Sequence, residues 1–326
     1  MITWGIVGLG KMANQFANAI KEVDNAQLIA IASKSILKLN QFSKEYHINN
    51  ENQFLNYEDL FKLKSVDAIY ISTLNNTHLQ LIINASKYKK KILCEKPIGL
   101  NLKEANLAST NIKKYKVFFY EAIAYRSHPQ TKNLLRLIKE GEIGDIYKIE
   151  STFGFKVKKI KKDSRLFNKN LGGGAILDVG CYPISFFNLF CKENEQLEFK
   201  NSNGSYASTG VEDEAEINLS IGEKIHCIGK VSLKQNLSNT CKIYGNKGTI
   251  EIASPWLPSN KSYLEISNDK SYYKKFTLAS KSLYSLQIES ISESFLNKNK
   301  MNNQLVDIVE SIKIMKVLDM WKKNLV

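Results

Sequence analysis

The sequence contains few of the residues that build disulfide frameworks and metal sites. It has 5 cysteines among 326 residues, scattered along the chain and nowhere arranged as CxxC. Its 4 histidines are widely separated, at His47, His78, His128 and His226. Odd-numbered, dispersed cysteines indicate reduced and mostly buried thiols. We therefore predict neither a disulfide framework nor a metal site.

Long apolar runs are also missing. No stretch approaches the ~20 apolar residues that span a bilayer. The first residues, MITWGIVGLG, lack the basic segment and the cleavage site of a signal peptide. Hydrophobic residues make up 43% of the chain and charged residues 24%, a composition typical of folded globular proteins. We expect a cytoplasmic protein without a membrane segment, long enough for two domains.

Acidic residues are fewer than basic ones, 32 against 46, which gives a formal net charge of +14. Such an excess suits a nucleic acid, a membrane surface or an anionic small molecule as partner. The lysines are spread along the chain, and the densest basic stretch is KVKKIKKDSR at 156–165. This stretch lacks the interleaved aromatic residues that stack on bases. A solvated loop is the favoured interpretation and no specific nucleic-acid binding is expected, while attraction of an anionic ligand stays open.

A glycine-rich segment follows the first predicted strand. Residues 2–7 (ITWGIV) are typical of a buried strand, and GLGKMA at 8–13 leads into a helical pattern. Gly8 permits a tight turn, Gly10 has no side chain to obstruct a pyrophosphate, and Ala13 lets the helix pack close to the strand. The helix N-terminus adds free N–H groups and positive dipole. The segment predicts dinucleotide binding, with a packing-only turn as the alternative.

Strand and helix patterns then alternate, which predicts a parallel, doubly wound sheet in a domain at 1–120. The strand-like stretches are 27–33, 67–72, 91–94 and 117–120, and the helical ones are 35–46, 77–88 and 101–114. An NAD-binding protein usually has an acidic residue after the second strand, where it bonds the ribose hydroxyls. Here Ser33 and Lys34 stand there instead. NADP is therefore favoured over NAD, although a solvated lysine after a strand is common.

Glu95, Lys96 and Pro97 follow the strand at 91–94. Together with GLGKMA and the later glycine run, this EKP segment resembles the Gfo/Idh/MocA oxidoreductases over nearly the whole chain. The segments YEAIAYRSHPQ and SRLFNKNLGGGAILDVGCYP are similar to the branch of glucose-fructose oxidoreductase, NADP-dependent xylose dehydrogenase and dimeric dihydrodiol dehydrogenase. The family often has Pro where Leu74 stands. The motifs and the resemblance together imply cofactor contacts from Gly8, Gly10, Lys11, Met12, Ser33, Lys34, Thr73, Asn75, His78, Glu95 and Lys96.

The resemblance implies a second, α+β domain at 121–326 with a large, open, mostly antiparallel sheet. Strand-like patterns at 145–155, 213–220, 224–232 and 241–252 agree with this, and IYGNKGTIEI at 243–252 resembles the family's sheet hairpin. One face of such a sheet would adhere to other proteins if left open. Family members commonly cover it by dimerising, so a homodimer or homotetramer is expected.

The glycine run LGGGAILDVGCYP at 171–183 carries an acid and a phenol four residues apart. Hydride removal from an alcohol carbon requires a base for the hydroxyl proton. A free Tyr has a pKa of ~10, and a nearby ammonium favours its phenolate form. We predict Tyr182 as the base, Lys96 as the ammonium, and Asp178, on the same helix face, holding Lys96 or a second hydroxyl. The glycines would let the backbone approach cofactor and substrate. The alternative is a buried Tyr and a helix-capping Asp.

Arg126, His128 and Arg165 are further substrate-contact candidates, with packing or salt bridges as the alternative. Pro129 suggests a turn into a helix at 131–140. The sequence thus predicts an NADP-dependent dehydrogenase or reductase acting on a hydroxyl or carbonyl carbon of a sugar or cyclic polyol. An NAD-dependent glycosidase of the same fold and a non-catalytic dinucleotide sensor remain as alternatives.

Overall fold

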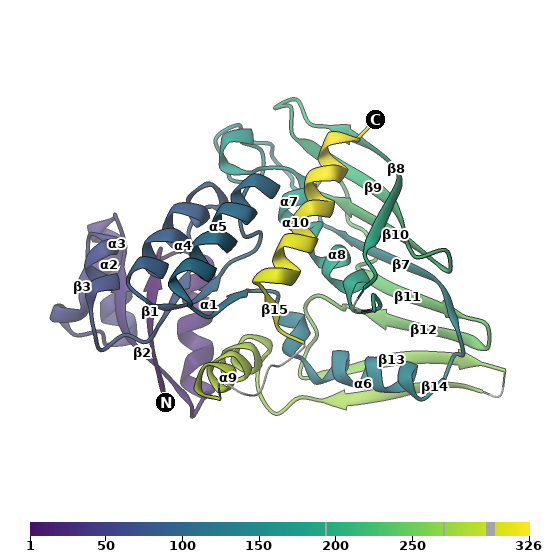
Figure 1. Ribbon diagram of the computed structural model, residues 1–326, viewed down its shortest axis with the longest axis horizontal. Helices are drawn as coiled ribbons and strands as arrows, with labels where there is room; N and C mark the ends of the chain where they lie inside the picture. Colours follow the sequence, from purple (N-terminus) through teal and green to yellow (C-terminus); the bar gives the residue numbers. More distant parts are fainter. Residues whose placement is uncertain (193, 270, 298–303) are drawn as a thin grey trace. The chain divides into compact units, whose positions relative to one another are not determined.

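The alternating first part of the chain builds the predicted parallel sheet. Its strands are β1 (Ile2–Val7), β2 (Ala26–Ala32), β3 (Gln53–Phe54), β4 (Ala68–Ile71), β5 (Lys91–Cys94), β6 (Phe119–Glu121) and β15 (Val306–Asp307). The computed structural model describes residues 1–192, 194–269, 271–297 and 304–326, and over these residues the strand order is β15-β6-β5-β4-β1-β2-β3 (Figure 1). β1 to β6 pair in parallel, and β15 joins β6 antiparallel. The order reverses between β1 and β4, where doubly wound folds bind dinucleotides.

Helices cover both faces of this sheet. They are α1 (Lys11–Ala19), α2 (Ile36–Tyr46), α3 (Tyr57–Lys62), α4 (His78–Lys87), α5 (Leu102–Tyr115) and α9 (Leu283–Leu296), with short helices η1 (Ile20–Glu22), η2 (Asn50–Asn52), η3 (Asn75–Thr77) and η4 (Ala124–Ser127). Right-handed crossovers place α1 on one face and α4 and α5 on the other. The predicted elements agree with these bounds to within a few residues. The short β3 and α3 were not predicted.

α9 comes from far along the chain yet packs on the first sheet, against α1, β1 and β2. Serine hydroxyls of α9 form hydrogen bonds with aromatic side chains of the sheet. Trp4 Nε1 on β1 donates to Ser292 Oγ at 3.1 Å, and the hydroxyls of Tyr120 on β6 and Ser294 are 2.6 Å apart. Phe295 packs against the rings of Trp4 and Tyr120. Since Trp4 and Ser292 are buried, α9 completes the core of this sheet.

The second sheet has the predicted, mostly antiparallel form. Its strands are β7 (Ile146–Gly154), β8 (Leu197–Tyr206), β9 (Glu212–Ile221), β10 (Ile225–Ser232), β11 (Thr240–Gly245), β12 (Gly248–Ala253), β13 (Lys261–Asn268) and β14 (Tyr272–Leu278). Over the described residues the order is β14-β13-β12-β11-β7-β10-β9-β8, with β7 and β10 parallel and the other neighbours antiparallel. β11 and β12 form the expected hairpin within 241–252.

One face of the second sheet is packed against helices. These are α6 (Pro129–Lys139), α7 (Ala175–Val179), α8 (Cys181–Asn188) and the later part of α10 (Ile308–Lys323), with η5 (Lys169–Leu171) in the loop before α7. In the part of the chain that Figure 1 draws as ribbon, no helix lies on the other face. That open face carries ion pairs on its middle strands, including Lys148–Glu150 at 2.6 Å within β7 and Lys242–Glu251 at 3.7 Å between β11 and β12. Its centre is polar, not apolar.

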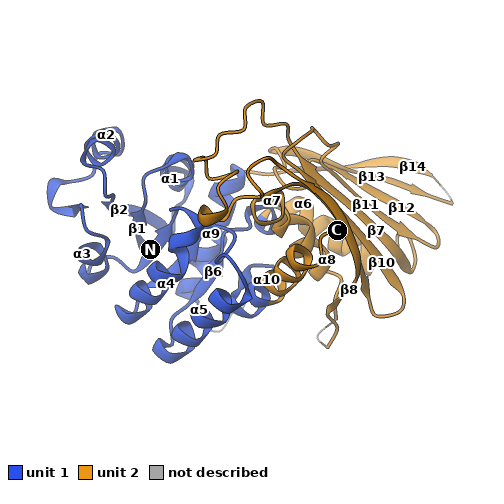
Figure 2. Cartoon of the chain, turned by 90° about the horizontal axis from the view of Figure 1, so that it is seen from above, with its two compact units in different colours: residues 1–127, 281–312 blue, residues 128–280, 313–326 orange. Residues whose placement is uncertain are grey.

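The chain divides into two compact units that interleave in sequence. Unit 1 comprises residues 1–127 and 281–312, and unit 2 comprises residues 128–280 and 313–326 (Figure 2). The sequence predicted domains at 1–120 and 121–326. The compact units differ from that division mainly at 281–312, because α9 and β15 complete the first sheet.

Candidate active site

The glycine-rich turn after β1 has the geometry that a pyrophosphate requires. Gly8 has φ 88°, and a Cβ there would lie 2.5 Å from Thr73 Cγ2, so only glycine fits. Around Gly10 the described chain leaves open space, with no heavy atom within 4 Å of a Cβ position. Within the described residues, no side chain caps the N-terminus of α1 and no acidic residue lies in its first turn. Lys11 and Met12 begin this helix, whose free N–H groups suit an anion.

The residues after β2 are arranged around the start of α2. Ser33 is buried, and its Oγ accepts from the Ser35 N–H at 3.2 Å. Lys34 is exposed, with its ammonium 5.7 Å from the centre of the Tyr57 ring. No carboxylate stands at these two positions. A hydroxyl and a cation therefore occupy the place where an acidic residue would select NAD.

The loop after β4 is tied to the loop after β5. Thr77 Oγ1 donates to Thr73 Oγ1 at 2.6 Å, and Asn75 begins η3. His78, fully buried, has Nδ1 2.8 Å from the Pro97 carbonyl and Nε2 3.3 Å from the Thr73 carbonyl. Burial lowers the pKa of His78, against the effect of these carbonyls. A neutral imidazole carries one N–H and donates to one of these carbonyls, and the shorter contact, 2.8 Å, joins α4 to the loop that carries Pro97.

In the EKP segment, Glu95 is bound to the sheet, whereas Lys96 lies on the turn that follows it. Glu95 Oε1 accepts from the buried Tyr70 hydroxyl at 2.5 Å, so β4 anchors it. The Lys96–Pro97 peptide bond is cis. Pro97 is buried, whereas Glu95 and Lys96 keep partial exposure. Lys96 thus lies on a turn at the surface of unit 1, and the chain after it is buried.

The glycine run is required by the packing of the chain on itself. Gly172 has φ 78° and ends η5. A Cβ at Gly173 would lie 2.8 Å from Leu166 O, and a Cβ at Gly174, which has φ 114°, would overlap the Glu212 carboxylate. These contacts give a different reason for the glycines from the predicted approach of cofactor and substrate. Burial raises the pKa of Glu212, against the opposing effects of Lys322 and of the Ile176 N–H.

Asp178 and Tyr182 lie on two consecutive helices, not on the single helix predicted. Asp178 is near the end of α7 and Tyr182 near the start of α8, with Gly180 between them. Pro183 has no N–H to donate to the carbonyl four residues earlier, and this missing helical hydrogen bond accounts for the break between α7 and α8. Gly180 keeps helical dihedrals, so the two side chains stay about one turn apart.

Asp178 is paired with one of the predicted substrate residues. Arg165 donates from Nη1 to Asp178 Oδ1 at 2.7 Å. The Asp178 side chain is 6% exposed and that of Arg165 is 53% exposed. The ion pair therefore links the buried carboxylate to the basic stretch 156–165.

Tyr182 stands in an aromatic cluster on the helix-covered side of the second sheet. The rings of Phe153 and Trp256 lie 5.0 and 5.8 Å from that of Tyr182, between centroids. Trp256 is buried, and its indole N–H donates to Thr152 O at 2.9 Å. The phenol ring is thus oriented by neighbours that are themselves fixed.

Arg126 and His128 have structural partners. Arg126, 2% exposed, makes a bidentate pair with Glu310 at 2.7 and 3.1 Å in unit 1. His128 caps α6 by accepting from the Gln130 N–H at 3.1 Å, and burial lowers its pKa to about 4. A neutral, buried capping histidine is a poor general base at neutral pH.

The structure therefore gathers the predicted residues in two groups. Unit 1 holds the glycine turn, Ser33, the loop after β4 and Lys96, and unit 2 holds Asp178, Tyr182 and Arg165. Sequence reasoning missed Tyr70, Glu121 and Trp256, whose contacts join residues far apart in the chain. A signal for Glu121 existed, since an acid at the end of an apolar strand is unusual.

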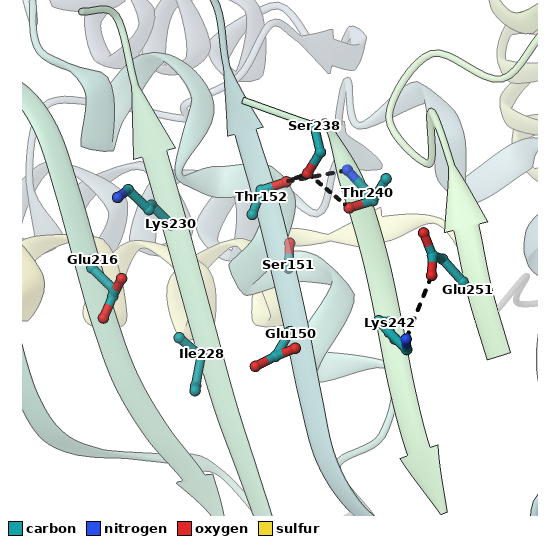
Figure 3. Close-up of a pocket in the computed structure, with 10 residues that line it drawn as sticks. All are labelled: Glu150, Ser151, Thr152, Glu216, Ile228, Lys230, Ser238, Thr240, Lys242 and Glu251. Carbon is teal, nitrogen blue, oxygen red and sulfur yellow. Dashed lines mark hydrogen bonds and ion pairs between the residues drawn. The ribbon is translucent and has the colours of Figure 1, made fainter. Parts of the chain in front are cut away.

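A hollow of about 310 Å³ lies on the open face of the second sheet (Figure 3). Its lining includes Glu150, Glu216, Lys230, Lys242 and Glu251. Tyr182 lies on α8, which packs against the opposite face of this sheet, so the hollow and Tyr182 are on different sides of it. Over the described residues, no group of three or more His, Cys, Asp or Glu is placed to hold a metal ion. A search of the same residues finds no helix with the length and hydropathy to span a membrane.

Two family models match the chain. Residues 2–122 match the GFO/IDH/MocA model described as an oxidoreductase family with an NAD-binding Rossmann fold, and residues 131–251 match the GFO/IDH/MocA C-terminal domain. Among curated proteins, trans-1,2-dihydrobenzene-1,2-diol dehydrogenase of Xenopus tropicalis is 30% identical over 260 residues, which cover 79% of this chain and 77% of that protein. The protein of that name from Homo sapiens is 27% identical over 261 residues, 79% and 76% of the two chains.

Solved structures share the fold at lower identity. An aldose-aldose oxidoreductase of Caulobacter crescentus, complexed with glycerol, has a TM-score of 0.90 at 19% identity and covers 99% of this chain and 97% of its own. A 3-ketoreductase of Actinomadura kijaniata, complexed with NADP and TDP-benzene, has a TM-score of 0.89 at 19% identity, with coverage of 99% and 98%.

Proposed function

The chain belongs to the Gfo/Idh/MocA oxidoreductase family, and on this premise we propose that it is an NADP-dependent dehydrogenase or reductase acting on a CH–OH carbon of a sugar or cyclic polyol. The observation that carries the proposal is a phenol, Tyr182, held in a fixed aromatic cluster four residues after the buried acid Asp178. A sensor that only binds a dinucleotide does not need a proton-transfer group. The names of the relatives make dihydrodiols and aldoses the first compounds to test.

The residues of unit 1 fit a dinucleotide. The open space at Gly10 and the N-terminus of α1 would receive the pyrophosphate, and Ser33 and Lys34 would receive a 2′-phosphate. When bound, the nicotinamide supplies the acceptor or donor of hydride. Thr73, Asn75, Glu95 and Lys96 lie on the loops after β4 and β5, at the carboxyl edge of the sheet where such a ring is bound.

The proposed proton chemistry belongs to the chain's own side chains. Tyr182 takes the hydroxyl proton of an alcohol during oxidation and returns it to the carbonyl oxygen during reduction. The Lys96 ammonium favours the phenolate of Tyr182 electrostatically. Asp178 accepts from a second substrate hydroxyl, while Arg165 orients that carboxylate through their ion pair.

A substrate screen tests the proposal. The purified chain is incubated with NADP and aldoses, inositols or trans-dihydrodiols, and NADPH absorbance is followed. At least one of these compounds should reduce NADP at a rate proportional to enzyme concentration. If NADPH remains constant with all three classes, and carbonyl compounds do not oxidise NADPH, the proposed activity is wrong.

Replacing Ser33 with Asp should reverse the cofactor preference from NADP to NAD. A carboxylate at that position would repel the 2′-phosphate and accept hydrogen bonds from ribose hydroxyls. Near a protein surface, like charges 4 Å apart repel by about 4 kcal/mol, so the ratio of the two dissociation constants should change by more than about tenfold. Titration by fluorescence or calorimetry measures both constants. Ser65→Asp, which adds the same charge at an exposed position of unit 1, should leave the ratio unchanged, and tighter NAD binding by the unmodified chain would contradict the proposal.

We further propose that the protein is cytoplasmic and assembles as a homodimer or homotetramer through the open face of the second sheet. Large side chains are exposed at the β13–β14 end of this face, with Phe276 53% and Leu278 76% exposed. Light scattering at micromolar concentration should give a mass of at least twice 37.1 kDa. Phe276→Asp should shift the mass towards the monomer, while Leu37→Asp on α2 should not, although Leu37 is 78% exposed. A particle of 37.1 kDa would overturn this proposed assembly.

A further inference from the structure

A buried carboxylate lies directly behind the EKP turn. Glu121 ends β6 and is only 3% exposed. Its Oε1 accepts a hydrogen bond from the Ile98 N–H at 3.1 Å. Burying a carboxylate costs free energy unless it is well bonded, and the mechanism above makes no use of this group. Its presence in the core therefore requires a reason.

The main chain of Glu121 is fixed on both sides. It pairs with Cys94 of β5 in parallel register and with Val306 of β15 in antiparallel register. The adjacent Ala122 N–H donates to Cys94 O at 2.8 Å. The carboxylate therefore extends from one of the most constrained positions of the sheet, which suits a group that holds another segment in place.

The EKP turn is also held from a second element. His78, at the start of α4, contacts the Pro97 carbonyl through Nδ1 at 2.8 Å. Two buried side chains thus bind consecutive residues, His78 at Pro97 and Glu121 at Ile98. Pro97, Ile98 and Gly99 are buried, while Lys96 keeps partial exposure. Fixing the buried residues restricts where the Lys96 side chain begins.

We propose that Glu121 is a positioning residue which, together with His78, holds the Pro97–Ile98 main chain and so places the Lys96 amine for proton transfer. The inference rests on the proposed function, because it assumes that Lys96 takes part in catalysis. Glu121 acts through Lys96 and does not touch the reacting atoms.

The charge of Glu121 changes in the neutral range, which gives the proposal a pH signature. Burial raises its pKa to about 7, opposed by the Ser311 hydroxyl, the Ile98 N–H and Lys96, while Glu310 adds to the increase. Glu310 is itself paired with Arg126 at 2.7 Å, and the Cys94 thiol on β5 has its pKa raised by burial and by Glu121. Ionised carboxylates accept stronger hydrogen bonds than neutral ones. The turn should therefore be held more firmly above pH 7 than below it.

The experiment compares Glu121→Met, which removes the acceptor, with Glu121→Gln, which keeps an acceptor but cannot ionise. Tyr120→Phe is the matched control, since it removes a buried hydrogen bond from the same strand without touching the turn. Displacing a catalytic group by about 1 Å can lower the rate by about 10²-fold. Glu121→Met should lower turnover by about this factor with NADP affinity unchanged, and Glu121→Gln should recover most of the activity while losing the pH dependence near 7. Tyr120→Phe should keep normal turnover.

Two further measurements separate positioning from loss of structure. The amide hydrogen of Ile98 should exchange faster in Glu121→Met than in Glu121→Gln or Tyr120→Phe, a readout that needs no substrate. In a Lys96→Met background, Glu121→Met should lower turnover no further, since both changes act through one group. If Glu121→Met does not fold, His78→Phe takes its place, with the same expected loss of turnover and the same lack of additivity.

Specific results would overturn the proposal. Unchanged turnover in Glu121→Met or in His78→Phe would do so, as would an unchanged Ile98 exchange rate or a further loss in the Lys96→Met background. Full turnover in Lys96→Met alone would instead contradict the proposed role of Lys96, and the positioning proposal with it. Failure of the inference alone leaves Lys96→Met impaired and Glu121→Met active, so the two failures are distinguishable.

Discussion

Replacing Tyr182 with Phe is expected to lower turnover ~10²–10⁴-fold, the usual contribution of general acid–base catalysis. The substitution keeps the ring that packs against Phe153 and Trp256 and removes only the titrating oxygen. NADP affinity should be unchanged, because the proposed phosphate contacts lie at Gly8, Gly10 and Lys34. Steady-state kinetics with the substrate found in the screen, together with a cofactor titration, measure both quantities.

Tyr206→Phe provides the control for this change. It removes the same atom from an exposed position of β8 in the same unit, where Tyr206 is 55% exposed. Turnover of this variant should equal that of the unmodified chain. Full activity in Tyr182→Phe would remove Tyr182 from the mechanism. His128 would then be a weak substitute, since burial lowers its pKa to about 4 and its ring caps α6.

Replacing Lys96 with Met is expected to lower turnover at neutral pH by about 10²-fold or more, because the proton transfer that its charge assists contributes ~10²–10⁴-fold. A phenol ionises with a pKa of ~10, and a nearby cation favours its ionised form. Without the ammonium, the rising limb of the oxidation rate against pH should therefore move to higher pH. The full profile of turnover against pH is the measurement, since a single pH would not distinguish a shifted limb from a uniform loss.

The control for Lys96→Met is Lys103→Met, which removes an exposed ammonium from α5. Its pH profile should coincide with that of the unmodified chain. A Lys96→Met variant that loses turnover equally at every pH would contradict the electrostatic role of Lys96. Such a result would leave Lys96 with a binding role only.

The sequence predicts the parallel sheet well, because each strand and helix of that sheet has a local pattern. The apolar run of β1, the turn at Gly8 and the N-terminus of α1 are contiguous, so one short segment reveals all three. α9 could not be assigned to this sheet in the same way. Its buried serines, among them Ser285 and Ser292, obscure the apolar face, and nothing local indicates a partner such as Trp4, 288 residues away.

The residues of the candidate site show the same difference between local patterns and distant contacts. Lys96, Asp178 and Tyr182 could be selected because their motifs are local and their chemistry is specific. The residues packed around them could not be selected, since Trp256 meets the Tyr182 ring from a distant part of the chain and Glu121 binds the Ile98 N–H across 23 residues. The glycine run shows a subtler limit. Its spacing indicates a close approach, and at Gly174 the Glu212 side chain is one group that approaches this closely.

The packing of α9 on the first sheet also constrains the order in which the protein acquires its structure during synthesis. The ribosome releases residues 1–127 long before residues 281–312, yet both belong to unit 1. At roughly 5–20 residues per second, translation of the intervening stretch takes on the order of ten seconds. Throughout that interval Trp4, Phe118 and Tyr120 lack the helix that covers them. The nascent first half therefore presents aromatic surface to chaperones and to neighbouring chains until the far end of the message has been read.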